Sequence, residues 1–248
     1  MTTGSQQGLA LLARVLVDPG DTIVAEGDPY GMIRFEGEHL PPIAKWSDRT
    51  LRLRSTSKIV APGLRLGFML GPEDLIAHLV VAKQAADLHT RTLDQHLLRE
   101  LVVEQPRWLD RHIEEIIPTY RAGRDALVSA VQSTFGEDVL WRIPEGGMFL
   151  WIDLHHGTDT TVALERALDA GVAYVPGSTF AVDKPNVDAL RLAYATATPE
   201  QLAEAVPRLA TALRLPCNFV FSARSSGRKD KITGFGFWVG QFGLGVLG

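Results

Sequence analysis

The sequence predicts an α/β protein in two successive parts, the second of which is a smaller α+β unit. In the first part, strand-like segments at residues 50–54 and 64–70 flank a polar turn, and segments with helical apolar spacing follow them. From about residue 139 the pattern changes to short strands with two helices. This second stretch has roughly one hundred residues, which is enough to form a core of its own.

Composition narrows the class of protein. The chain has 248 residues, of which 46% are hydrophobic and 22% charged, and its formal net charge is -4. These values indicate a folded globular protein without a general attraction to nucleic acid or anionic lipid, so we expect neither nucleic-acid nor membrane partners. Cys217 is the only cysteine, and residues 1–20 lack a signal pattern, which favours the cytoplasm. His155 and His156 show no metal-ligand spacing, so we expect no metal.

The first predicted element is a helix. An apolar run over residues 8–17 has helical length, Ser5 is a plausible N-cap, and the segment 18–20 ends the run. A glycine turn that leads into a helix N-terminus presents free backbone N–H groups, which suits a phosphate, although an ordinary capped helix fits equally. A buried strand at 22–26 and a turn at 27–31 follow.

The middle of the chain is predicted to be helical. Helices are expected over residues 73–86 and 92–103, and a long amphipathic stretch begins near Pro106. Pro118 interrupts that stretch. Because proline lacks the backbone donor and clashes with the preceding turn, we expect a kink there or two helices.

The second unit is predicted from short alternating segments. We expect strands at residues 139–143, 147–154, 172–175 and 189–195, and helices at 161–170 and 199–213.

The polar turn between the first two strands contains the most informative residue. Lys58 lies in Ser55-Thr56-Ser57-Lys58 and is followed by Pro62-Gly63 and, seven residues on, by Arg65. A lysine amine condenses with an aldehyde only when neutral, and burial near cationic groups lowers its pKa. The serines and the arginine fork suit a phosphate. The alternative is a solvated surface lysine on a turn, but the spacing favours a site for a phosphorylated aldehyde.

In this motif the chain resembles the pyridoxal-phosphate aminotransferases of fold type I, in the aspartate and 2-aminoadipate/kynurenine group. Motifs at 144–149 and 174–180 are also similar to that family. The resemblance implies an incomplete large domain, a mostly parallel sheet with helices, followed by the small α+β domain. It places the partial large domain at 1–106, the small domain at 107–213, and a non-homologous, poorly ordered tail at 214–248.

The resemblance also implies roles for individual residues. Lys58 would be the catalytic Schiff-base lysine, and Tyr30 would hydrogen-bond the ring hydroxyl of the cofactor, pyridoxal 5′-phosphate. Arg191 would bind the substrate carboxylate, whereas its pattern alone fits an exposed edge-strand arginine equally well. The predicted contacts of the cofactor phosphate are Ser5, Gln6, Ser55, Ser57 and Arg65.

The implied function is transamination between an amino acid and a 2-oxo acid, by a homodimer. The chain departs from the family at Gly27, where relatives carry an aspartate that keeps the pyridine nitrogen protonated. A central segment that carries a stacking aromatic and an asparagine is also absent. The alternative is therefore a catalytically impaired or vestigial member that binds the cofactor weakly or not at all. We do not expect the effector half of a transcription regulator, because no DNA-binding domain precedes Met1.

Overall fold

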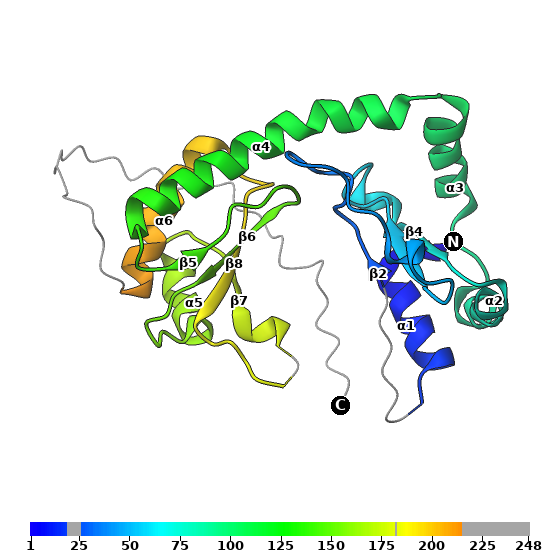
Figure 1. Ribbon diagram of the computed structural model, residues 1–248, viewed down its shortest axis with the longest axis horizontal. Coiled ribbons are helices and arrows are strands. Elements are labelled where there is room, and N and C mark those ends of the chain that lie inside the picture. Colours follow the sequence, from blue (N-terminus) through cyan, green and yellow to red (C-terminus); the bar gives the residue numbers. More distant parts are fainter. Residues whose placement is uncertain (19–25, 182, 215–248) are drawn as a thin grey trace. The chain divides into compact units, whose positions relative to one another are not determined.

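The computed structural model describes residues 1–18, 26–181 and 183–214, which form two four-stranded sheets with their helices (Figure 1). Most of the predicted strand at 22–26 and nearly all of the predicted tail at 214–248 therefore lie outside the described residues. Within the described ranges no helix is long and apolar enough to cross a membrane. The boundary predicted at 106/107 stays a prediction; a long helix begins directly after it, at Trp108.

The first sheet has the strand order β1-β4-β3-β2. Its strands are β1 (Thr2–Thr3), β2 (Glu26–Gly27), β3 (Arg52–Ser55) and β4 (Leu66–Leu70). The pair β2–β3 is parallel, and the pairs β3–β4 and β1–β4 are antiparallel. The two strands predicted around the lysine turn are thus adjacent, and Lys58 lies in the connection between them, as predicted.

Helix α1 (Ser5–Leu16) begins one residue earlier than predicted, because its N-cap is Gly4 and not Ser5. Gly4 has φ 79°, a left-handed conformation that glycine adopts without strain. The turn lies directly against β4: a Cβ on Gly67 would be 2.6 Å from the carbonyl carbon of Gly4 and 2.8 Å from the Ser5 nitrogen. Further along, Gly8 lets α1 pack closely on Leu53 of β3.

The helices that follow agree with the predicted segments except in two places. They are α2 (Glu73–Asp87), α3 (Thr92–Arg99), a π-helical segment (Glu100–Glu104) and α4 (Trp108–Phe135). The helix predicted over 92–103 therefore changes to π geometry near Glu100. Of the two expected outcomes at Pro118, the division into two helices is wrong, since α4 continues through it as one helix; the kink stays a prediction. Proline removes only its own N–H bond, and α4 has buried apolar side chains on both sides of it, Ile113 before and Leu127 after.

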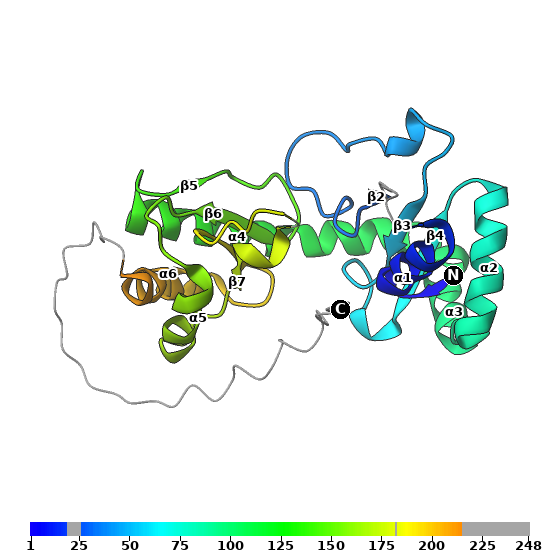
Figure 2. The ribbon, with the colours of Figure 1, turned by 90° about the horizontal axis from the view of Figure 1, so that it is seen from below.

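The second sheet has the order β5-β6-β8-β7 and is entirely antiparallel. Its strands are β5 (Leu140–Trp141), β6 (Phe149–Asp153), β7 (Val175–Pro176) and β8 (Ala189–Ala193). Helices α5 (Thr160–Asp169) and α6 (Pro199–Leu213) gather with part of α4 about this sheet (Figure 2). Short 3-10 helices lie at Ile43–Lys45, Pro62–Leu64 and Gly177–Phe180.

Because side chains alternate along its strands, the second sheet has two different faces. One face is buried under the three helices and carries Leu150, Ile152, Leu190 and Leu192, which are at most 5% exposed. The opposite face carries half-buried side chains that include Phe149, Trp151 and Arg191. Because α4, α5 and α6 occupy the first face, the second face remains available for a site.

The segment after Tyr30 lies along the loop before β6. Phe35 N donates to Glu145 O, and Gly147 N donates to Ile33 O, each at 2.7 Å. A Cβ on Gly146 would be 2.4 Å from Ile33 O, so this glycine is required for a close backbone approach. The contact places Tyr30 beside Phe149 of β6, with ring centroids 5.7 Å apart.

Candidate active site

The turn that carries Lys58 is fixed by local hydrogen bonds. Thr56 donates to Leu66 O from both its backbone nitrogen (3.1 Å) and its hydroxyl (3.2 Å). Ser57 N donates to the Ser55 hydroxyl oxygen at 3.2 Å. These bonds tie the end of β3 to the start of β4, so that Lys58 projects from a defined turn and not from a free loop.

Arg65 lies against the glycine turn of α1. Its Nη2 would be 2.8 Å from a Cβ built on Gly4. Arg65 itself has φ 49°, a left-handed conformation that costs a non-glycine residue of order 1–3 kcal/mol. At the same turn, α1 has no side-chain cap and no acidic residue in its first turn. A guanidinium and uncapped helix N–H groups therefore meet at one place, which suits an anion.

Lys58 lies among positive charges. Partial burial is the largest cause that lowers its pKa from the ordinary value of 10.5, followed by repulsion from Arg191 and from Arg65. This agrees with the expectation that burial and neighbouring cations favour the neutral amine. The structure thus brings both Arg65 and Arg191 within electrostatic reach of Lys58, although Arg191 is 133 residues from Lys58 in the sequence.

The lowered pKa of Lys58 can be tested by measuring the reactivity of its amine. Reductive methylation with formaldehyde and cyanoborohydride, followed by peptide mass analysis, should show a pH profile for Lys58 with its midpoint below 10.5, because only the neutral amine reacts. Replacing Arg191 by glutamine should move that midpoint upward, since one repulsive charge is removed. A Lys58 midpoint at or above 10.5, or one that stays unchanged in Arg191→Gln, would contradict the prediction.

Arg191 of β8 lies between two aromatic rings. Its guanidinium carbon is 4.0 Å from the ring centroid of Phe149 and 4.6 Å from that of Phe180. Burial raises the pKa of Tyr30, and the nearby charge of Arg191 opposes this. Because cation–π contacts fix the plane of a guanidinium, its fork is held in one orientation for a planar anion.

The aromatic pair was not among the predicted site residues. Phe149 and Phe180 each end one of the two small-domain motifs, at 144–149 and 174–180. The feature that could have identified Phe149 is the alternation of side chains along a strand. Phe149 pairs with Ala193, so its side chain lies on the same sheet face as Arg191. That feature required the register of β6 against β8, which the sequence alone did not provide.

The other predicted phosphate contacts occupy different environments. Ser55 is buried and Ser57 is half-buried in the lysine turn, and Ser5 is half-buried as the first residue of α1. The side chain of Gln6 is exposed, so its backbone N–H in the first turn is the better placed donor. The roles assigned to these residues stay predictions.

Asp28 does not take the place of the aspartate absent at Gly27. Its carboxylate lies 3.5 Å from Arg54 Nη1 and 4.0 Å from Arg52 Nη2. Gly27 is paired with Leu53, on the opposite face of β3 from those two arginines. Among the described residues, a Cβ on Gly27 would meet no atom within 4 Å, so the position is open to them.

His156 and the nearby Asp159 have partners of their own. The carboxylate of Asp159 accepts from the backbone nitrogens of Thr161 and Val162 as the cap of α5, and His156 Nε2 lies 2.9 Å from Asp138 O. Across the ranges the structure describes, no group of three or more His, Cys, Asp or Glu side chains could hold a metal ion.

The fold and the lysine turn are those of a fold type I aminotransferase. Residues 35–209 match the family model for aminotransferase class I and II. The chain belongs to this family, and the predicted fold class is confirmed. The expectation of a mostly parallel first sheet is wrong, since two of its three described strand pairs are antiparallel.

Several relatives are similar over most of this chain. It is 38% identical over 196 residues to aromatic-amino-acid aminotransferase 1 of Thermococcus litoralis, covering 78% of this chain and 46% of that protein. It is 35% identical to 2-aminoadipate transaminase of Thermus thermophilus, covering 77% and 49%. The crystal structure of Pyrococcus horikoshii kynurenine aminotransferase superposes with a TM-score of 0.73 at 36% identity, covering 85% and 51%. The chain thus spans about half the length of these relatives.

The cofactor of this family is pyridoxal 5′-phosphate, and a similar structure, LysN of Thermus thermophilus, contains N-(5′-phosphopyridoxyl)-L-leucine. The residues present fit its phosphate and aldehyde ends. Side chains at Gly4 or Gly67 would fill the space where Arg65 and the start of α1 approach β4. Lys58, with its lowered pKa, suits the aldehyde. At the ring-nitrogen end, Gly27 offers no carboxylate.

Proposed function

We propose that this chain is a pyridoxal-phosphate-dependent transaminase that moves an amino group between an amino acid and a 2-oxo acid. The observation that carries the proposal is the grouping of Lys58 with Arg65 and Arg191 in a member of the aminotransferase family. A neutral amine, an anion site at a helix N-terminus and a fixed guanidinium are the three groups that this chemistry requires.

The proposed roles follow from these positions. Arg65, the first-turn N–H groups of α1 and the hydroxyls of Ser5, Ser55 and Ser57 hold the phosphate, with Gln6 contributing from the first turn. Lys58 Nζ would hold the aldehyde end of the cofactor and, as a free amine, would be the base that takes the proton from the amino-acid Cα. Arg191 holds the carboxylate so that the Cα–H bond is oriented, and Tyr30 donates to the ring hydroxyl. The bound cofactor supplies the electron sink.

The test is turnover by the purified chain. Pyridoxal phosphate should produce a visible absorption band that changes when an amino acid is added, and initial rates with a 2-oxo acid should show ping-pong kinetics. The relatives are named for aromatic amino acids and 2-aminoadipate, so these are the first donors to try. No band and no response to any donor would favour the alternative, an impaired or vestigial member. The observation behind that alternative is Gly27.

Introducing a carboxylate at position 27 distinguishes the transaminase from the impaired member of the family. Gly27→Asp should tighten cofactor binding by about tenfold or more, because a charge-assisted hydrogen bond contributes about 1.5–3 kcal/mol. The position is open, so the side chain can be accommodated. Gly27→Asn controls for size without charge. Equal affinities for all three proteins would contradict the assigned role of position 27.

We further propose that two copies associate. Large apolar side chains on α2, α3 and their connections are 62–73% exposed, namely Val81, Leu88, Leu93 and Val103. Exposed apolar groups gathered on neighbouring elements are typical of an interface. The homodimer and the cytoplasmic location both stay predictions for this chain.

A further inference from the structure

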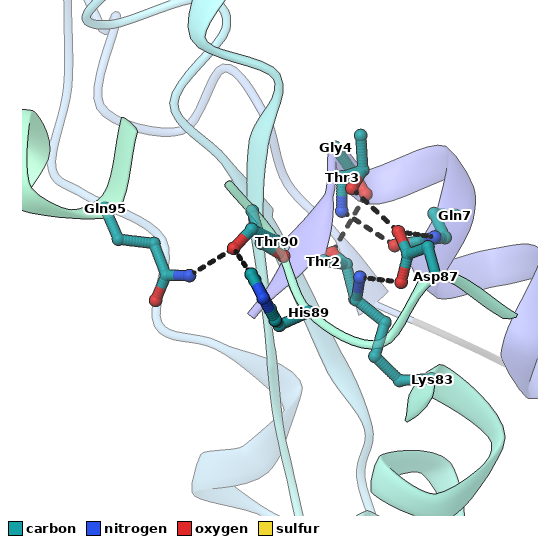
Figure 3. Close-up of polar contacts among 9 residues, drawn as sticks. All are labelled: Thr2, Thr3, Gly4, Gln7, Lys83, Asp87, His89, Thr90 and Gln95. Atoms are coloured by element: carbon teal, nitrogen blue, oxygen red, sulfur yellow. Dashed lines mark hydrogen bonds and ion pairs between the residues drawn. The ribbon is translucent and has the colours of Figure 1, made fainter. Parts of the chain in front are cut away.

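The carboxylate of Asp87, the last residue of α2, is bonded to the start of α1. Its Oδ2 accepts from the Thr3 hydroxyl at 3.2 Å and from Gln7 Nε2 at 2.8 Å. Its Oδ1 accepts from Lys83 Nζ. Figure 3 shows Lys83, Asp87, Gln7 and Thr3 converging beside Gly4. The end of one helix thus fixes the turn from which another begins.

Gln7 is the side chain that this arrangement controls. It is the third residue of α1, the position from which a side chain commonly turns back to cap a helix. Its Oε1 accepts from Thr3 N at 2.8 Å, and its Nε2 donates to Asp87. With both ends of its amide occupied there, Gln7 does not cap α1, and the N-cap residue Gly4 has no side chain that could do so. The first-turn N–H groups therefore carry no side-chain cap and can bind a ligand.

Asp87 is the charge partner of a buried lysine. Lys83 is only 7% exposed, and its Nζ donates to Asp87 Oδ1. The hydrogen bond from Lys83, followed by that from Gln7, lowers the pKa of Asp87, so that its carboxylate is ionised at neutral pH. Ionised acceptors make stronger hydrogen bonds than neutral ones, which favours a rigid attachment of Thr3 and Gln7.

We infer that Asp87 is a positioning residue for phosphate: by holding Gln7 and Thr3, it keeps the Gly4 turn in the shape that presents backbone N–H groups to the phosphate beside Arg65. The inference rests on the proposed function, and it concerns only the phosphate end of the cofactor. Asp87 therefore should influence phosphorylated ligands and leave the aldehyde chemistry at Lys58 unchanged.

The experiment compares two aldehydes that differ in one group. Dissociation constants for pyridoxal phosphate and for pyridoxal are measured with wild type, Asp87→Ala and Gln7→Leu. Each variant should weaken pyridoxal phosphate binding by about tenfold and pyridoxal by less than about twofold, since only the first ligand uses the turn. The double variant should lose little more than either single one, because the two residues form one unit. Asp87→Asn, which keeps an acceptor but loses the charge, should fall between wild type and alanine.

The matched control is Asp169→Ala. Asp169 is likewise the last residue of a helix, α5, but it is exposed. Helix α5 packs in the core of the second sheet. It should leave both affinities unchanged. Equal losses for the two aldehydes would show that Asp87 only stabilises the fold, and unchanged affinity for pyridoxal phosphate would also overturn the inference.

An inorganic phosphate titration separates this inference from the proposed function. If wild type binds neither aldehyde, the proposed function fails. The shift of the unfolding temperature on addition of phosphate then tests the positioning role of Asp87 by itself. A shift in wild type that Asp87→Ala removes supports the positioning role. A shift that persists in Asp87→Ala, or none in wild type, overturns it.

Discussion

Replacing Lys58 by alanine is expected to reduce transamination by at least about 10⁴-fold, the upper range for removing a general acid–base group, and to abolish covalent attachment of the cofactor. The physical reason is that the half-buried amine near Arg65 and Arg191 is both the attachment point and the proton carrier. Turnover is measured in single-turnover and steady-state assays, and attachment by the visible absorption band.

The matched control is Lys45→Ala, which removes an exposed lysine from a 3-10 helix of the first part of the chain. It should leave both readouts unchanged. A Lys58→Ala protein that kept the band would show that the aldehyde attaches elsewhere and would contradict the assigned site.

Replacing Arg191 by glutamine is expected to lower kcat/KM by about 10²-fold or more. A guanidinium makes two charge-assisted hydrogen bonds to a carboxylate, each contributing about 1.5–3 kcal/mol. Arg191→Lys should recover only part of the loss, because an ammonium cannot form the planar fork that Phe149 and Phe180 orient.

Two comparisons make the role of Arg191 specific. Arg142→Gln removes an exposed arginine near the same sheet and should have no effect. Amines that lack the carboxylate should react equally slowly with wild type and Arg191→Gln. If the substitution slowed those amines as strongly as amino acids, Arg191 would not be the carboxylate contact.

The local features of this fold could be predicted from the sequence. Pro199–Leu213 is predicted and observed with the same bounds, since Thr198 and Gln201 form a capping box at its start. The lysine turn could be located because its serines, glycine and arginine lie close together in the sequence. The N-cap of α1 was misplaced by one residue, because the choice of Gly4 depends on the approach of Gly67 from β4.

Long-range contacts account for what could not be predicted. The bonds from Asp87 to Thr3 and Gln7 join residues that are 84 and 80 positions apart, and no local pattern encodes them. The rings on either side of Arg191 come from β6 and from the 3-10 helix Gly177–Phe180, which required the strand register. The course of α4 through Pro118 was decided by tertiary packing against the second sheet.

Borohydride reduction of the wild-type chain mixed with pyridoxal phosphate, followed by peptide mass mapping, tests the central claim most directly. We predict a stable phosphopyridoxyl group on the peptide that contains Lys58, prevented by an excess of inorganic phosphate. Modification spread over exposed lysines such as Lys45, or none at Lys58, would contradict the account.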